Sequence, residues 1–288
     1  MAKIISIFLA IYSFFLGLFG YPTYPHGDEV DMNKFELVWN DEFEGDAVDT
    51  NKWGAGWWPA TPTSVRKGGF WNTKLASVSD GALHIATKYY ENGLDGGAPG
   101  WYSTQLTTQG HFEQKYGYYE CRCILPEGAG MWAAFWMMCK GVGTVNGDGK
   151  DGTEIDIFES AFYTDGKAWD TVQSALHFDG YGDAHQQKKV HQSHVYGNDP
   201  YKTYNTYGLE WNEKEYIFYI NGVEAGRSSF GGVSQVPEYL LLSVEVGGNN
   251  GVPAASWCGP SVETNTGDIS DFIVDYVRVY QYKDLLNG

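Results

Sequence analysis

The chain has 288 residues, of which 43% are hydrophobic and 16% aromatic, and this composition supports a large folded core and excludes a disordered chain. Thirty-six acidic residues against 19 lysines and arginines give a formal net charge of −17, which repels phosphate backbones and excludes nucleic acid as a natural partner. Four cysteines are too few for a disulfide scaffold in a chain of this length.

Residues 1–20 carry one early cation, Lys3, followed by an almost unbroken apolar stretch from Ile4 to Phe19. This order predicts a secretory signal peptide and therefore a secreted, extracellular protein. The alternative is an uncleaved membrane anchor, but a spanning helix needs about 20 apolar residues, more than this stretch provides. A linker over residues 21–34 is expected to follow, and no membrane contact is expected after cleavage of the signal peptide.

From residue 35 onward the sequence is a succession of short alternating runs, separated by turns of Gly, Asn and Asp. No run has a sustained helical period, so an all-β domain is predicted over residues 35–282, with a tail at 283–288. So many strands without covering helices favour a jelly-roll sandwich of two antiparallel sheets. The predicted strands are Phe35–Trp39, Ala82–Lys88, Tyr116–Leu125, Trp132–Met138, Glu154–Glu159, Gln173–Phe178, Tyr204–Trp211, Tyr216–Ile220, Tyr239–Val246 and Phe272–Tyr280.

Two short patterns within this region make local predictions. The Asn221-Gly222 pair after an alternating run predicts a tight hairpin, with the return strand beginning at Val223. Cys121 and Cys123 lie two apart on a predicted strand and are expected to be small buried residues on one face, without metal-binding spacing. A disulfide between Cys139 and Cys258 is conceivable in an oxidising compartment, but spacing does not assign it.

Three acids crowd the segment Glu154-Ile-Asp-Ile-Phe-Glu159. In a regular strand Glu154 and Asp156 would share a face and Glu159 would point the other way. One extra residue, a β-bulge at Ile157–Phe158, would return Glu159 to their face. Like charges on one face destabilise a sheet, which favours a chemical role over the alternative of a solvated edge-strand face.

Cleavage of a glycosidic bond needs two carboxyl groups, one as nucleophile and one as proton donor. The Cα atoms of Glu154 and Glu159 would lie about 13 Å apart, and side chains leaning inward would bring the carboxyl groups to about 5 to 5.5 Å, the separation of a retaining mechanism. Asp156 lies between them, where its charge would help to keep Glu159 protonated.

The acid segment resembles the signature of glycoside hydrolase family 16. Further motifs are similar to strands of that family, and they are Leu37-Val-Trp-Asn-Asp-Glu-Phe43, Tyr116-Gly-Tyr-Tyr-Glu-Cys-Arg122, Met131-Trp-Ala-Ala-Phe-Trp-Met137 and Val274-Asp-Tyr-Val-Arg-Val-Tyr280. The resemblance implies a concave substrate cleft, with Glu154 as nucleophile, Asp156 as its assistant and Glu159 as general acid and base. The two residues between Asp156 and Glu159 resemble the bulged branch of laminarinases, agarases and carrageenases.

The resemblance also implies substrate-binding residues. Trp132 and Trp136 share a face of their predicted strand, and the family places the second at the subsite of the cleaved bond, where a ring packs on a sugar. His177 matches a family histidine next to the acids. Core packing is the alternative for all three residues.

Further positions carry weaker expectations. Asn72 matches a cleft asparagine that contacts sugar hydroxyls, and Asp275 resembles a calcium-binding aspartate, with a solvated strand acid as the alternative. Glu245 stands where many family members have a small or apolar residue, so it is expected to alter sugar recognition. The loop tryptophans Trp57, Trp58, Trp101, Trp169 and Trp257 are expected to include further sugar platforms.

The predicted function is therefore a retaining endo-β-glucanase that hydrolyses β-1,3- or mixed-linkage β-1,3-1,4-glucan. The alternatives are an endo-hydrolase or transglycosylase acting on xyloglucan or a marine galactan, and a non-catalytic carbohydrate-binding sandwich, against which the complete acid set argues. No cofactor is needed for the chemistry, a structural calcium ion is the one cofactor implied, and a monomer is expected. The net charge favours a neutral polymer over a sulfated one unless a local basic patch overrides it.

Overall fold

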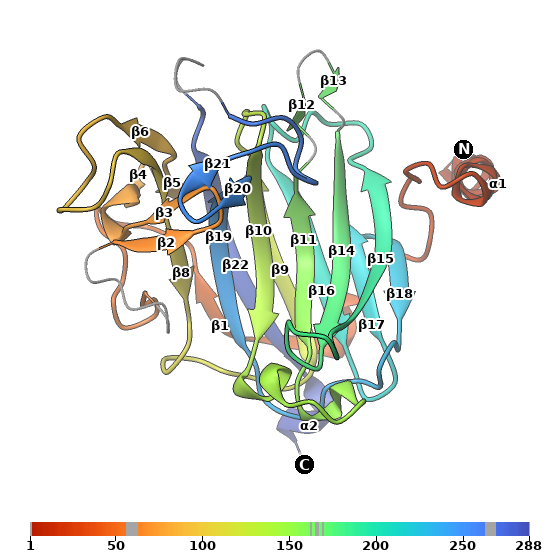
Figure 1. Ribbon diagram of the computed structural model, residues 1–288. Helices are drawn as coiled ribbons and strands as arrows, with labels where there is room; N and C mark the ends of the chain where they lie inside the picture. Colours follow the sequence, from red (N-terminus) through yellow and green to blue (C-terminus); the bar gives the residue numbers. More distant parts are fainter. Residues whose placement is uncertain are drawn as a thin grey trace.

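Two antiparallel sheets pack face to face in the computed structural model, which describes residues 2–55, 63–161, 163–164, 167–168, 170–262 and 269–287 (Figure 1). The front sheet consists, in spatial order, of β15 (Gln186–His194), β14 (Thr171–Phe178), β11 (Glu154–Ser160), β10 (Met131–Met138), β19 (Tyr239–Val246) and β8 (Gln105–Thr107). The rear sheet consists of β18 (Val223–Ser228), β17 (Tyr216–Ile220), β16 (Asn205–Trp211), β9 (Gly117–Ile124), β22 (Phe272–Tyr282), β5 (Ala82–Ile85) and β4 (Ala76–Ser79), with β1 (Phe35–Asp41) paired to β22. This architecture confirms the predicted all-β jelly-roll sandwich.

Smaller elements decorate the sandwich. A four-stranded sheet lies at one end of the front sheet and consists of β2 (Ser64–Arg66), β3 (Gly69–Trp71), β7 (Gly100–Ser103) and β6 (Lys88–Tyr90). Two short ribbons pair β12 (Tyr163–Thr164) with β13 (Lys167–Ala168) and β20 (Gly248–Asn249) with β21 (Val252–Pro253). The helices are α1 (Ala2–Leu18), α2 (Lys283–Leu286) and the 3-10 turns η1 (Met32–Lys34), η2 (Thr73–Leu75), η3 (Lys140–Gly143) and η4 (Gly149–Asp151).

Strict alternation along β10 divides its side chains between the core and the outer face of the front sheet. Ala133, Phe135 and Met137 belong to the hydrophobic core between the two sheets. Trp132 and Trp136, on the opposite face, line an open cleft. The period-2 geometry of a strand therefore places one face of β10 in the core and the other in contact with solvent or ligand.

Most predicted strands are confirmed, but one ends early, and several strands lie outside the predicted set, among them β15 and the short β4 and β8 of the two main sheets. The predicted strand Ala82–Lys88 ends at Ile85, and the chain resumes as β6 in a different sheet. Strand β15 is absent from the prediction because its first four residues, from Gln186 to Lys189, are polar and exposed at the edge of the sheet. The predicted hairpin is confirmed, since Asn221 and Gly222 have φ values of 49° and 76° and join the paired strands β17 and β18.

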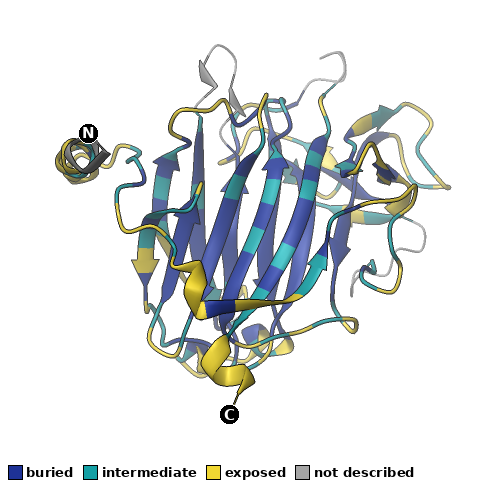
Figure 2. Cartoon of the chain, turned by 180° about the vertical axis from the view of Figure 1, so that it is seen from behind, coloured by how far each residue is buried: buried dark blue, intermediate teal, exposed yellow. Residues whose placement is uncertain are grey.

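The N-terminal helix α1 stands beside the sandwich, and many of its apolar side chains are exposed (Figures 1 and 2). Within the described residues, no helix combines the length and apolar character that crossing a membrane requires. The segment expected as a linker is docked on the domain: Thr23 N donates to Gln192 O at 2.9 Å on β15, and Val30 N donates to Gly222 O at 2.9 Å beside β18. Residues 21–34 thus lie along the edges of both sheets.

All four cysteines are free and buried. Cys121 and Cys123 lie in the hydrophobic core, as predicted from their spacing. The conceivable disulfide between Cys139 and Cys258 is not formed: the Cys139 thiol lies 4.0 Å from Asp151 O, whereas the Cys258 thiol lies 2.9 Å from the hydroxyl of Ser256.

Candidate active site

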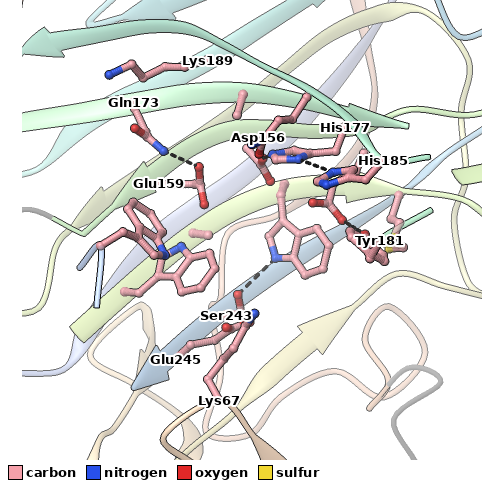
Figure 3. A pocket seen from close by; sticks show the side chains of 18 of the residues that line it. Lys67, Asp156, Glu159, Gln173, His177, Tyr181, His185, Lys189, Ser243 and Glu245 are labelled. Atoms are coloured by element: carbon pink, nitrogen blue, oxygen red, sulfur yellow. Dashed lines mark hydrogen bonds and ion pairs between the residues drawn. The ribbon is translucent and has the colours of Figure 1, made fainter. Parts of the chain in front are cut away.

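The predicted β-bulge is present in β11. Opposite β14, Asp156 pairs with Ala175 and Glu159 pairs with Gln173, so Ile157 and Phe158 together face the single residue Ser174. The register of β11 against β10 shifts at the same place. The bulge turns Glu159 to the face of Glu154 and Asp156, and all three acids line one cleft (Figure 3).

Buried hydrogen bonds hold the bulge from the core side. The Ser174 hydroxyl donates to Ile157 O at 2.7 Å and lies 2.9 Å from His191 Nε2. Burial lowers the pKa of His191 to about 3, so the ring is neutral. Its Nδ1 has no partner within the described structure, which fits a tautomer whose Nε2–H donates to Ser174.

The cleft has a volume of about 940 Å³ and crosses the outer face of β19, β10, β11 and β14. Burial and the neighbouring Asp156 raise the pKa of Glu154 to about 7. Burial and the charge of Asp156 also raise the pKa of Glu159 well above its usual range. Glu159 is therefore suited to hold a proton, and Gln173 Nε2 donates to its Oε2 at 2.9 Å.

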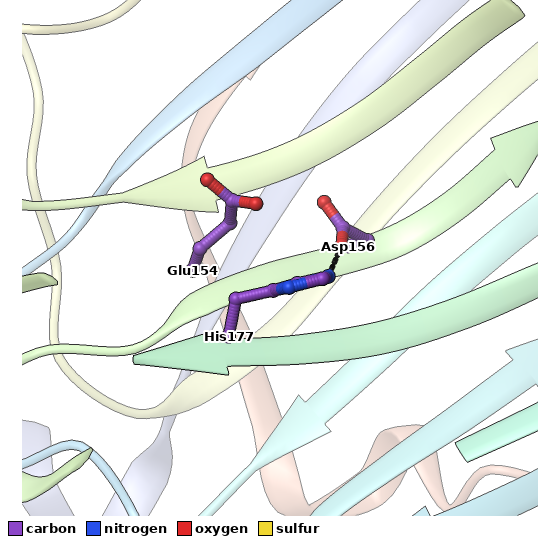
Figure 4. Close-up of side chains that lie close together, drawn as sticks. All are labelled: Glu154, Asp156 and His177. Carbon is purple, nitrogen blue, oxygen red and sulfur yellow. Dashed lines mark ion pairs between the residues drawn. The ribbon is translucent and has the colours of Figure 1, made fainter. Parts of the chain in front are cut away.

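Asp156 and Glu154 are linked to histidine and tyrosine side chains. His177 Nε2 lies 3.2 Å from Asp156 Oδ2 (Figure 4), and His177 Nδ1 lies 3.0 Å from His185 Nε2. The Tyr181 hydroxyl donates a hydrogen bond to Glu154 Oε2. Tyr181 and His185 come from the β14–β15 connection, where no sequence motif marks them as site residues.

One group of side chains in the site has the donor set of a metal site. Glu154, Asp156 and His177 each offer one ligand atom within 4.8 Å of the others, and no other such group exists in the described part of the chain. Each of the three is already tied into the hydrogen-bond network of the acids. The network accounts for their proximity without an ion.

Two predicted tryptophans lie on the cleft wall. Trp136 is largely buried and its Nε1 donates to Ser243 Oγ at 3.1 Å, so it both packs against neighbours and lines the cleft. Trp132 meets Trp257 edge to face with ring centroids 4.7 Å apart, and Lys67 Nζ lies 5.6 Å from the Trp132 ring centroid. Trp257 also lines the cleft. These rings are available to sugar units on the side of the cleft near β19.

Of the other loop tryptophans that were expected to include sugar platforms, the structure describes only Trp101. Trp101 is 3% exposed and packs against Tyr89, with ring centroids 5.6 Å apart, so it is a core residue and not one of the expected sugar platforms. Trp57, Trp58 and Trp169 lie outside the described residues.

Glu245 lines the cleft as a member of an ion pair. Arg66 Nε donates to Glu245 Oε1 at 2.7 Å, and the carboxyl group is almost completely buried. The second oxygen, Oε2, has no hydrogen-bond partner in the described structure. Glu245 therefore contributes to the cleft wall as a paired carboxylate whose second oxygen is buried.

The structure corrects the expectation for Asn72. Its side chain is 1% exposed and is not part of the cleft wall. Its Nδ2 donates to Asp95 Oδ2 at 2.9 Å, and its Oδ1 accepts from Lys74 N at 3.0 Å as the cap of η2. Asn72 therefore holds a loop together and does not contact sugar.

Asp275 lies on the rear sheet, away from the cleft. Arg122 Nη1 donates to its Oδ2 at 2.5 Å, and the Arg122 guanidinium stacks on Tyr204 with 4.4 Å to the ring centroid. A calcium ion at this carboxylate would lie next to a fixed positive charge, so the local charges do not fit the ion. The calcium site therefore stays a prediction without support from these side chains.

A cleft with two glutamates and an aspartate on one face, lined by tryptophans, defines a glycoside hydrolase. The family model described as "Beta-porphyranase A-D, GH16 domain" matches residues 36–282. The chain belongs to glycoside hydrolase family 16, as the sequence motifs predicted.

Named relatives and solved structures agree with this assignment. The chain is 28% identical to the endo-1,3-1,4-beta-glycanase EglC of Rhizobium meliloti. The match covers 71% of this chain but only 39% of the relative. It is 28% identical to the beta-porphyranase B of Zobellia galactanivorans, covering 92% of this chain and 89% of the relative. The catalytic domain of an endo-1,3-beta-glucanase from Thermotoga petrophila superposes with a TM-score of 0.67 at 26% identity, covering 89% of this chain and all of that domain.

Proposed function

We propose that this chain is a secreted retaining endo-glycanase that cleaves a β-linked polysaccharide by double displacement. The observation that carries the proposal is the bulge in β11, which brings Glu154 and Glu159 to one wall of an open cleft. A cleft that crosses several strands accepts the interior of a polymer, which suits internal cleavage. The apolar N-terminal segment supports export, and a monomer is sufficient because one chain supplies all three acids.

In the first step the Glu154 carboxylate attacks the anomeric carbon, the glycosidic C–O bond breaks, and Glu159 transfers its proton to the leaving oxygen. In the second step the Glu159 carboxylate takes a proton from water, the water oxygen attacks the anomeric carbon, and the bond to Glu154 breaks. Two inversions retain the anomeric configuration. Burial, with Asp156 beside it, favours a protonated Glu159 for the first step, and burial and Glu245 raise the pKa of Asp156 itself to about 8.

Two substrate classes fit this site. Two relatives are named endo-1,3-1,4-beta-glycanases, one a glucan endo-1,3-beta-glucosidase and one a beta-glucanase, and these names support the glucan class predicted from the sequence. The family model and the relative that matches nearly the whole chain are named for porphyran, a sulfated galactan. The charges on the cleft wall favour the second class.

The cleft wall carries two lysines in a strongly acidic protein. Lys67 lies beside the Trp132 ring, and Lys189 donates to the neutral Gln192 at 3.2 Å. Within the described structure neither lysine pairs with a carboxylate, whereas Arg66 is paired with Glu245. The two lysines lie on different sides of the cleft (Figure 3), and each offers a separate cation to an anionic group of a bound polymer, although the net charge of the protein is −17. We therefore favour a galactan with anionic groups over a neutral glucan.

Three experiments test the proposal. Glu154→Gln should abolish sugar release from every substrate, and unchanged release would exclude the mechanism. A panel of porphyran, laminarin, mixed-linkage glucan, agarose and xyloglucan, analysed by product size and anomeric configuration, should give internal cleavage with retention. Lys67→Gln should raise KM on porphyran and leave activity on a neutral polymer unchanged. Preferred cleavage of laminarin or mixed-linkage glucan would restore the glucanase prediction.

A further inference from the structure

The connection between β14 and β15 carries a side chain into the site that the double-displacement mechanism does not use. This connection is fixed at its base. Asp179 has a φ of 61° and is buried, and its Oδ1 accepts from Asn146 N and Gly147 N at 3.0 Å each. Gly180 N donates to Val142 O at 2.7 Å. The next residue, Tyr181, therefore leaves a defined anchor.

Tyr181 reaches from this anchor to the nucleophile. The residue is 59% exposed, yet its hydroxyl donates to Glu154 Oε2 inside the cleft (Figure 3). Burial of the hydroxyl and the adjacent carboxyl group raise the pKa of Tyr181, so the phenol stays protonated and remains a donor. Within the described structure Glu154 Oε1 accepts no hydrogen bond, so this oxygen is free to attack.

His185 ties the same connection to the second acid. Its ring stacks on His177 at an interplanar angle of 13° with centroids 5.2 Å apart, and it lies 5.6 Å from the Tyr181 ring centroid. If both histidines carry the proton on Nε2, His185 donates to His177 and His177 donates to Asp156, which satisfies both bonds. The connection thus contacts Glu154 directly and Asp156 through one histidine.

We propose that Tyr181 is a further catalytic residue, which donates a hydrogen bond to the non-attacking oxygen of the nucleophile throughout the reaction. The inference rests on the proposed function, because it assigns Glu154 as nucleophile. A hydrogen bond to a carboxylate is stronger than one to a neutral ester. Tyr181 therefore stabilises the free carboxylate relative to the glycosyl ester and assists its departure in the second step.

The same bond helps to keep Glu154 ionised. The other charged or titratable groups around Glu154 are Asp156 and Glu159 on β11, His177 on β14, Arg66 on β2 and Glu238 before β19. Burial and Asp156 oppose ionisation, whereas His177 and Arg66 favour it. The hydrogen bond from Tyr181 lowers the pKa of Glu154, so its removal should raise that pKa while the other effects stay in place.

The test is Tyr181→Phe, which keeps the exposed ring and removes only the hydroxyl. Tyr196→Phe is the matched control, because Tyr196 is similarly exposed and lies outside the cleft. The acidic limb of the kcat/KM profile of Tyr181→Phe should move to higher pH by about one unit. With an activated aryl glycoside as substrate, hydrolysis of the glycosyl-enzyme should slow about tenfold or more. Because the first step then outpaces the second, the phenol that leaves the substrate should appear in an initial burst. The control should match the wild type.

An acidic limb that does not move would overturn the role of Tyr181, even if kcat falls, because a merely structural contact would lower kcat without changing the ionisation of Glu154. Glu154→Gln separates this failure from failure of the proposed function. Loss of activity in Glu154→Gln together with an unmoved limb in Tyr181→Phe refutes only the tyrosine. Activity that survives in Glu154→Gln refutes both.

Discussion

Ser174 is the residue opposite the bulge, and its replacement by alanine tests whether the core side of the sheet fixes the catalytic geometry. The substitution leaves Ile157 O and His191 Nε2 without the bonds at 2.7 and 2.9 Å that Ser174 supplies. Both groups are buried, and each unpaired buried group costs about 1–3 kcal/mol, so the expected loss of unfolding free energy is about 2–6 kcal/mol. That is a large share of the roughly 5–15 kcal/mol that stabilises a typical domain.

The effect on catalysis should exceed what stability explains. A loosened bulge displaces Glu159 relative to Glu154, and a misplacement of about 1 Å can lower kcat by about a hundredfold. Ser193→Ala is the matched control: Ser193 is a buried serine on the adjacent strand β15, and its hydroxyl lies 3.0 Å from Thr23 Oγ1. Since Thr23 Oγ1 also donates to Gln192 O at 3.4 Å, the control should lose only about 0.5–1.5 kcal/mol.

Two measurements on both variants decide whether Ser174 fixes the bulge. Urea unfolding gives the loss of stability, and kcat on soluble polysaccharide is measured under conditions where each variant is folded. Equal losses of stability in the two variants, with kcat of Ser174→Ala at the wild-type value, would show that Ser174 does not hold the bulge.

Two further substitutions probe buried charges. Burial raises the pKa of Glu238 to about 8. Between the unfolded pKa near 4.3 and this value the folded state holds a proton that the unfolded state has released, so the stability from this group is present at low pH and is lost as pH rises. Glu238→Gln should therefore flatten the fall of the melting temperature between pH 5 and 8, and a parallel pair of curves would contradict this. Arg66→Gln removes the cation next to the buried Glu245 and should cost about 3–5 kcal/mol in urea unfolding. The double variant Arg66→Gln, Glu245→Gln should recover part of that loss, and a double variant less stable than Arg66→Gln would refute the argument.

Features that depend on the periodicity of strands could be predicted from the sequence. Counting residues from Glu154 to Glu159 was sufficient to predict the bulge, because a sheet face tolerates only even spacing without one. The same periodicity placed Trp132 and Trp136 on the cleft face of β10. In both cases the pattern is local and one rule decides it.

Contacts between distant loops could not be predicted in this way. Asn72 lies in a suitable sequence context, but its hydrogen bonds to Asp95 and Lys74 depend on how the loop folds. Tyr181 and Lys67 enter the cleft from connections without a periodic pattern, so only the fold shows them there. Position along the chain does not determine which loop side chains meet.

The docked segment before β1 has a consequence for solubility. Strands β15 and β18 lie at the open edges of the two sheets, where unpaired backbone groups invite pairing with another molecule. Residues of this segment cover part of each edge: His194 N donates to Thr23 O at 2.8 Å, and Glu224 N donates to Asp28 O at 3.0 Å. The segment covers part of the β15 edge and part of the β18 edge, and so it protects these two edges against pairing with another molecule.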